Sequence, residues 1–223
     1  MSIQRAANMR DSMFRHLLVL SLAACSCRTG PLERPRPASS ARAAAVEITV
    51  GCVDPLVGLR VKMGSGVAIG PRHVLTAKHV IDCGEGAAII TVTPPSGKER
   101  VAIVDYASDT ADAARLYVMG DAPLYNTRPV GRGYLERLDA PVCTATAFPR
   151  RDWRCGRVQQ FYEGDEAGYV RTDLVATFGN SGSGVYDANG NLVGLLVMAT
   201  LTSTGQIDGM VIETRIGKLL DVQ

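Results

Sequence analysis

A serine surrounded by glycines is the strongest candidate for chemistry in this chain. Ser181 lies in the run Phe178-Gly-Asn-Ser-Gly-Ser-Gly184, directly before an apolar segment. Glycines let the backbone turn sharply and direct successive N–H groups into one concavity. Main-chain N–H groups arranged in this way can hold an oxyanion, and we expect those of Gly179 and Ser181 to do so. Ser181 is then a candidate nucleophile for acyl transfer, and it needs a general base.

Two other segments supply a candidate base and a candidate acid. His79 comes at the end of the segment Val74-Leu-Thr-Ala-Lys-His79, and histidine is the usual base near neutral pH. Asp112 opens the segment Asp112-Ala-Ala-Arg-Leu-Tyr-Val118. A carboxylate is needed to hold the tautomer of the imidazole and to stabilise the imidazolium. The sequence therefore predicts a nucleophile, a base and an acid in three separate segments.

Each of the last two residues has a rival. His73 follows Pro71 and Arg72, a combination that favours a turn leading into a strand. Asp109 also precedes an x-Ala pair, but the strand-like segment 116–118 continues from Asp112. We therefore favour His79 and Asp112.

The elements that must position these residues are short strands. The chain has 23 glycines, 11 prolines and only 5% aromatic residues, which indicates many turns. Many short strands with frequent turns predict an all-β sandwich or barrel, with a helix only at 216–220 and a turn at 77–80. The expected strands are 46–50, 66–69, 74–76, 88–93, 101–105, 116–119, 142–148, 157–162, 169–172, 184–186, 192–198 and 210–213.

Together, the three segments resemble the trypsin/chymotrypsin-fold serine peptidases. Residues 76–79 fit the Thr-Ala-x-His pattern of that family, 112–116 fit Asp-x-Ala-x-Leu, and 179–183 fit Gly-Asp/Asn-Ser-Gly-Gly/Ser, in the same chain order. The form of the third motif is similar to bacterial glutamyl endopeptidases and high-temperature-requirement proteases. Arg115 is a departure, because the family usually has an aliphatic residue there. The resemblance covers about residues 46–222.

The resemblance implies an all-β fold of two six-stranded antiparallel β-barrels, with the active site in the cleft between them and a short C-terminal helix. The N-terminal barrel is expected at about 46–125 and the C-terminal barrel at about 130–215, within a protease domain of 46–223. The implied activity is that of a serine endopeptidase, which acts on protein or peptide substrates through an acyl-enzyme and needs no cofactor or metal. We expect a monomer.

Departures from the family bear on activation and specificity. Asn180 stands where vertebrate digestive relatives have an aspartate that pairs with a freshly cleaved N-terminus. Asparagine has no charge to offer such an amine, so we expect that this protein is not activated by cleavage of its N-terminus. Val175 occupies the position that floors the specificity pocket, six residues before Ser181, and offers no carboxylate for Arg or Lys. With Met198 and Ala199 also in this pocket, the expected P1 side chain is small or medium-sized and apolar.

The cysteines indicate two disulfides. Cys143 and Cys155 flank a loop between strand-like segments, so a local bridge is natural, and a similar bridge occurs in the bacterial α-lytic protease group. Cys52 and Cys83 then form the second pair. A zinc site built from the four thiolates is the alternative, although Cys-x-x-Cys spacing is missing.

The N-terminal segment has the pattern of an export signal. Basic residues precede a short apolar stretch, 17–24, which ends in the lipobox-like sequence Leu22-Ala-Ala-Cys25. We expect a lipoprotein signal peptide at 1–24 and lipidation of Cys25, with ordinary signal cleavage as the alternative. Residues 25–45 are rich in Pro, Arg and Ala, which favours a disordered tether. The chain is then exported and lipid-anchored to a membrane of a bacterial cell envelope.

Charge and composition narrow the remaining functions. The formal net charge is +2, and the three arginines and one aspartate of the expected leader account for it. The net charge of the chain after the expected leader is close to zero, which argues against nucleic-acid binding. Three histidines are too few for a His-rich metal site. Two alternatives to an enzyme remain, a catalytically silent protease-like binding lipoprotein and a purely structural envelope lipoprotein.

Overall fold

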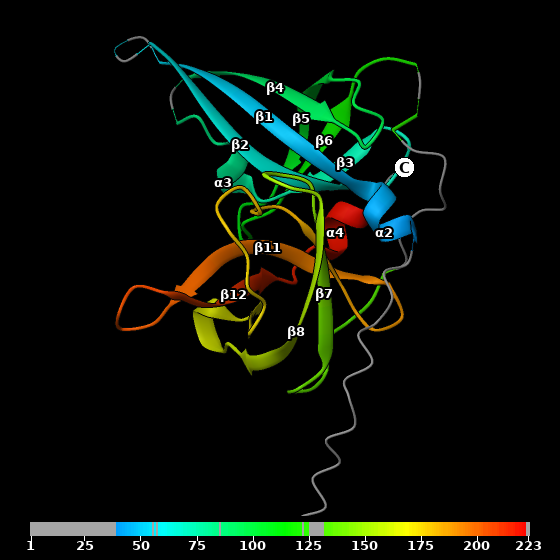
Figure 1. The fold of residues 1–223 in the computed structure, drawn as a ribbon. Coiled ribbons are helices and arrows are strands. Elements are labelled where there is room, and N and C mark those ends of the chain that lie inside the picture. The colour runs from blue at the N-terminus through cyan, green and yellow to red at the C-terminus, as the bar shows by residue number, and fades with distance from the viewer. Residues whose placement is uncertain are drawn as a thin grey trace, which may run out of the picture. The chain divides into compact units, whose positions relative to one another are not determined.

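Twelve strands form two closed, six-stranded antiparallel β-barrels (Figure 1). The computed structural model describes residues 39–54, 56, 58–84, 86–121, 123–124 and 132–221. The first barrel has the strand order β1-β2-β3-β6-β5-β4 and the second β10-β11-β12-β9-β8-β7. The double-barrel fold expected from the resemblance is therefore confirmed. The strands are β1 (Ala45–Asp54), β2 (Gly58–Ala68), β3 (His73–Thr76), β4 (Ala87–Thr93), β5 (Arg100–Ala107), β6 (Ala114–Val118), β7 (Pro141–Thr146), β8 (Asp152–Phe161), β9 (Tyr169–Thr172), β10 (Gly184–Tyr186), β11 (Leu192–Leu201) and β12 (Ile207–Glu213).

Alternating side chains build the barrel interiors. In β6, Ala114, Leu116 and Val118 are buried while the two residues between them are half-buried. This period of two is what a closed sheet requires. The core of the first barrel also includes buried residues of the second, such as Tyr186 and Leu195. The two barrels therefore pack against each other through apolar side chains.

The second strand begins much earlier than expected. β2 starts at Gly58 instead of residue 66, because β1 and β2 form a long hairpin with register from Ala45↔Val67 to Asp54↔Gly58. Leu59 and Val61 in this extension are 67% and 61% exposed. Because these apolar side chains lie on the outer face of the strand, the alternation of apolar and polar residues by which a strand is predicted from sequence is lost there.

The helices are short. α3 (Lys78–Ile81) and α4 (Gly217–Leu220) lie where a turn and a C-terminal helix were expected, and η2 (Gly164–Glu166) is a 3₁₀ turn. None of the helices among the described residues could cross a bilayer, since all are too short.

The expected disordered tether at 25–45 is wrong for its last residues. Residues 39–44 form helix α2 (Ser39–Ala44), and Ala45 begins β1. Ala41 and Ala44 are fully buried, and the Arg151 guanidinium donates a 2.8 Å hydrogen bond to the Ala45 carbonyl. The burial of these small apolar side chains, together with the hydrogen bond from Arg151, which is distant in sequence, keeps this segment ordered. The rest of the expected tether and the expected signal peptide lie outside the described residues.

The four cysteines of the domain form Cys52–Cys83 and Cys143–Cys155. The second bridge joins directly opposed residues of β7 and β8. Because all four sulfurs are in disulfides, no thiolate among them is left for the zinc site considered above.

Candidate active site

Two neighbouring strands bring the candidate base and acid to one end of the first barrel. The last residue of β3, Thr76, pairs with the first residue of β6, Ala114. His79 follows Thr76 by three residues, and Asp112 precedes Ala114 by two. Antiparallel register thus places both side chains beyond the same edge of the sheet.

The two residues are joined by two hydrogen bonds. His79 Nδ1 lies 2.6 Å from Asp112 Oδ2, and the His79 backbone N–H donates to Asp112 Oδ1 at 2.9 Å. A carboxylate bound to Nδ1 leaves Nε2 of the neutral imidazole as the proton acceptor. The His79 side chain is 46% exposed, so its ring is accessible from solvent.

The environment of Asp112 keeps it ionised. Burial is the largest single influence and raises the pKa of Asp112, but hydrogen bonds from the side chain and backbone of His79, its charge and the Lys78 N–H together outweigh it. The pKa of Asp112 is therefore lowered overall. An ionised acid is what an imidazolium partner requires.

The turn that carries Ser181 is attached to both barrels. The Ser181 carbonyl accepts a 2.8 Å hydrogen bond from the Ser65 N–H on β2, and the Gly182 N–H donates at 2.7 Å to the Leu196 carbonyl on β11. A Cβ at Gly182 would lie 2.3 Å from Thr76 Oγ1 and 2.9 Å from the Ala77 nitrogen. The turn therefore packs directly against the segment that leads to His79.

Among the described residues, no hydrogen bond joins the Ser181 hydroxyl to the His79 imidazole. The structure thus joins His79 and Asp112 by direct hydrogen bonds. The Ser181 turn is brought near them by the packing of Gly182 against Thr76 and Ala77. In proteins without bound substrate such nucleophile–base bonds are often long and tighten when the substrate binds.

The N–H groups of the turn divide into two sets. Those of Asn180, Gly182 and Ser183 donate to backbone carbonyls of residues 177, 196 and 180. Those of Gly179 and Ser181 have no acceptor within the described part of the chain. These are the two N–H groups that the sequence analysis expected to hold an oxyanion, and they remain available to one.

Two buried residues support this turn: Ser65, which was not identified from the sequence as a site residue, and Asn180, which was considered there only for activation. Ser65 is fully buried, and its hydroxyl donates to the Gly179 carbonyl at 3.0 Å and accepts from the Phe148 N–H at 3.1 Å. Asn180 is also buried; its Oδ1 accepts from the Thr177 N–H at 2.8 Å. The sequence signal that could have identified Ser65 is its position between two glycines of a strand, Gly64 and Gly66.

The rivals from the sequence lie elsewhere. His73 begins β3 and its ring packs edge-on against Tyr117 at 5.4 Å between centroids. Burial is the main cause that lowers the pKa of His73, followed by the charge of Arg115. Asp109 is exposed, and Asp112, not Asp109, contacts His79.

The residues expected to form the specificity pocket are accessible. Val175 and Met198 are 55% and 58% exposed, and Ala199 is half-buried. The Val175 carbonyl accepts a 3.0 Å hydrogen bond from Arg154 Nη1. Within the described ranges, no group of three His, Cys, Asp or Glu side chains could hold a metal ion.

Comparison with known proteins identifies the family of the domain. A family model described as a trypsin-like peptidase domain matches residues 64–195, which is more than half of the chain and includes all three candidate catalytic residues. A comparison with curated proteins finds no match. On the strength of the matched region and the double-barrel fold, this chain belongs to the trypsin-like peptidase domain family.

Proposed function

We propose that this protein is a serine endopeptidase in which Ser181, His79 and Asp112 form the catalytic triad. The observation that carries the proposal is the double hydrogen bond between His79 and Asp112, at 2.6 and 2.9 Å. It fixes both the ring and the backbone of the candidate base. The family match supports the same peptide-bond chemistry.

The mechanism is acyl transfer in two halves. His79 Nε2 takes the proton of the Ser181 hydroxyl, and Oγ attacks the carbonyl carbon of the scissile peptide bond. The N–H groups of Gly179 and Ser181 bind the developing oxyanion, and His79 then gives the proton to the leaving amine. Water, activated by the same imidazole, releases the acyl group from Ser181. Asp112 stays ionised throughout and stabilises the imidazolium.

A fluorophosphonate probe tests the assignment directly, because it modifies only a serine that a nearby base activates. We expect labelling of the intact protein and none of Ser181→Ala, with Ser183→Ala as the matched control that keeps its label. Folded protein that stays unlabelled would refute the proposal and favour the catalytically silent binding protein.

The proposed substrates have a small or medium-sized apolar P1 side chain. Val175, Met198 and Ala199 offer no carboxylate to a cationic P1 group. The Arg154 guanidinium that donates to the Val175 carbonyl is itself paired with Asp152 at 2.8 Å, so it leaves no unpaired charge beside the pocket floor for a charged P1 group to meet.

We also propose that the protein is a bacterial lipoprotein that acts as a monomer in the cell envelope. Its parts would be a signal peptide (1–24), a tether from Cys25 and the protease domain (46–223), with barrels at about 46–125 and 130–215. The two disulfides are typical of an exported protein. Incorporation of labelled palmitate that is lost in Cys25→Ser, but kept in Cys27→Ser, tests the anchor, and sedimentation of the domain tests the monomer.

A further inference from the structure

The short helix that carries His79 leaves carbonyl groups at its C-terminal end without partners inside the helix. α3 has four residues, and at its two ends the Val80 N–H donates to the Ala77 carbonyl and the Asp82 N–H to the Lys78 carbonyl, both at 3.1 Å. The carbonyls of His79 and Asp82 therefore need partners from outside the helix. A side chain that supplies these partners would fix the position of the catalytic base.

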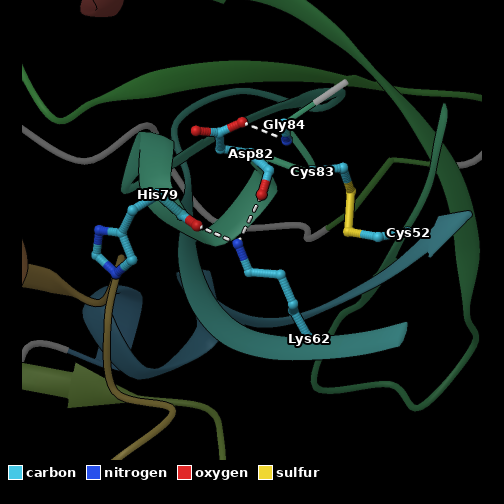
Figure 2. Close-up of a disulfide and its surroundings, with 6 residues drawn as sticks. All are labelled: Cys52, Lys62, His79, Asp82, Cys83 and Gly84. Carbon is cyan, nitrogen blue, oxygen red and sulfur yellow. Dashed lines mark hydrogen bonds between the residues drawn. A yellow bond between two sulfur atoms is a disulfide. The ribbon is translucent and has the colours of Figure 1, made fainter. Parts of the chain in front are cut away.

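Lys62 supplies them from β2. Its Nζ donates to the His79 carbonyl at 2.5 Å and to the Asp82 carbonyl at 2.7 Å (Figure 2). The His79 imidazole points away from this amine in Figure 2, so Lys62 holds the backbone and leaves the ring free to react. A cation at the C-terminal end of a helix is also favoured by the partial negative charge there.

The neighbouring residues let Lys62 reach this position. Lys62 pairs with buried Val50 across β1 and β2, so its side chain starts on the inner face of the barrel. Two residues later, a Cβ at Gly64 would lie 2.7 Å from Val80, which shows how closely β2 approaches α3. The side chain of Lys62 is therefore long enough to reach from β2 to the carbonyls at the C-terminal end of α3.

A disulfide also attaches the segment that follows His79 to the first barrel. Cys52, on β1, is bonded to Cys83, the residue that follows Asp82 (Figure 2). The turn is completed by Asp82 Oδ1, which accepts from the Gly84 N–H at 2.8 Å. The disulfide to β1 and the two hydrogen bonds from Lys62 therefore both hold the segment that follows His79.

We propose that Lys62 is a positioning residue for the catalytic base, an inference that rests on the proposed peptidase function. The His79 backbone is held on one side by Asp112, which accepts from its N–H, and on the other by Lys62, which donates to its carbonyl. Lys62 sets where the imidazole lies relative to Ser181 without touching substrate. It affects turnover more than substrate binding.

The test compares steady-state kinetics of Lys62→Met, Lys62→Arg and Lys98→Met. Methionine keeps an unbranched side chain out to the ε position but donates no hydrogen bond, so we expect kcat to fall about tenfold with KM nearly unchanged, since small misplacements of catalytic groups cost turnover. Arginine restores donors and charge and should recover most of kcat. Lys98→Met removes an exposed lysine outside the site and should leave both constants unchanged. An unchanged kcat in Lys62→Met, even with a lower Tm, overturns the proposal; should that variant not fold, Lys62→Gln is measured in its place.

A second measurement separates this inference from the proposed function. The Nδ1 proton of His79, held by Asp112, should give a downfield proton resonance in the full domain whether or not the protein cleaves peptides. We expect this resonance to shift or broaden in Lys62→Met and to stay in Lys98→Met. If the wild-type protein resists fluorophosphonate, the proposed function fails, yet the resonance still decides the role of Lys62. An identical resonance in the wild-type protein and Lys62→Met contradicts it.

Discussion

The side-chain amide of Asn180 donates a 2.7 Å hydrogen bond from Nδ2 to the carbonyl oxygen of Phe148. Asn180 directly precedes the proposed nucleophile and is 2% exposed. Its Oδ1 accepts from the Thr177 N–H, so both ends of the amide are used within the domain. The side chain of Asn180 is therefore held by neutral partners, and we predict that the turn needs no charged N-terminus.

Replacement of Asn180 by aspartate should damage this arrangement. The carboxylate would lose the donor to Phe148 and place a negative charge against that carbonyl in a buried site. We expect Asn180→Asp to lower the free energy of unfolding by about 1–3 kcal/mol and to reduce activity. Denaturant unfolding and peptide hydrolysis check both effects.

The same contact predicts how activity depends on processing. Uncleaved protein that keeps helix α2 should already be fully active, because no new amine is needed beside Asn180. Activity that rises sharply only after cleavage near Val46 would contradict this expectation.

The Ser65 hydroxyl provides a second prediction. It is fully buried and bridges the Gly179 carbonyl to the Phe148 N–H, so Ser65→Ala leaves both groups without a partner. We expect a loss of about 1–3 kcal/mol in the free energy of unfolding. We also expect kcat to fall, because the Gly179 N–H belongs to the proposed oxyanion site. Ser203→Ala, in the β11–β12 loop, is the control and should change neither quantity.

The lowered pKa of Asp112 predicts a pH-dependent share of stability. A carboxyl whose pKa is lower in the folded than in the unfolded state stabilises the fold above its unfolded pKa of about 3.9. This share is lost as the pH falls through the lower, folded value. Asp112→Asn should therefore flatten the dependence of the free energy of unfolding on pH below about 4, relative to the wild type. At neutral pH it should lower kcat by about 10³–10⁴-fold. Equal pH slopes in both proteins would refute the first expectation, and an active Asn variant the second.

The strands and the candidate site were predictable because their signals are local. His79 follows an apolar strand, Asp112 opens one, and Ser181 lies in a glycine turn before a third, so strand ends together with the family motifs made these three residues the candidates. Pairing of β3 with β6 then brings His79 and Asp112 together, and that pairing follows from the family resemblance. Each of the twelve expected strands overlaps one that the structure contains, although their ends differ.

Contacts between distant residues were beyond reach of the sequence. Arg115, which departs from the aliphatic residue of the family, lies with Nε 2.5 Å from Asp105 Oδ2. Its Nη1 donates to the Leu219 and Asp221 carbonyls at the C-terminal end of the described chain. Neither partner can be inferred from periodicity, because periodicity reports which face is buried and not what meets a polar group there. Lys62 was missed for the same reason.

Substrate preference can be checked with a panel of reporter peptides that differ only at P1. We expect small or medium-sized apolar residues to exceed Arg, Lys and Glu in kcat/KM by about tenfold or more, because a charged side chain would be desolvated without a carboxylate or imidazole partner. A panel in which Arg or Glu peptides are cleaved best would overturn the assignment of the pocket to Val175, Met198 and Ala199.

Gly182 predicts how tightly the nucleophile turn is packed onto the first barrel. Its φ is +84°, and an added Cβ would lie 2.2 Å from the Ser65 carbonyl oxygen and 2.3 Å from Thr76 Oγ1. Gly205 has a nearly equal φ of +80° but open space around it, so Gly205→Ala measures backbone strain alone. We expect Gly182→Ala to cost at least about 1–3 kcal/mol more than Gly205→Ala in the free energy of unfolding, since the two backbone segments must move apart. That movement also separates Ser181 from His79, so fluorophosphonate labelling should slow in Gly182→Ala and not in Gly205→Ala. Equal stabilities and equal labelling rates would mean that the turn does not press on Thr76, and the backbone packing that brings Ser181 to His79 would have to be abandoned.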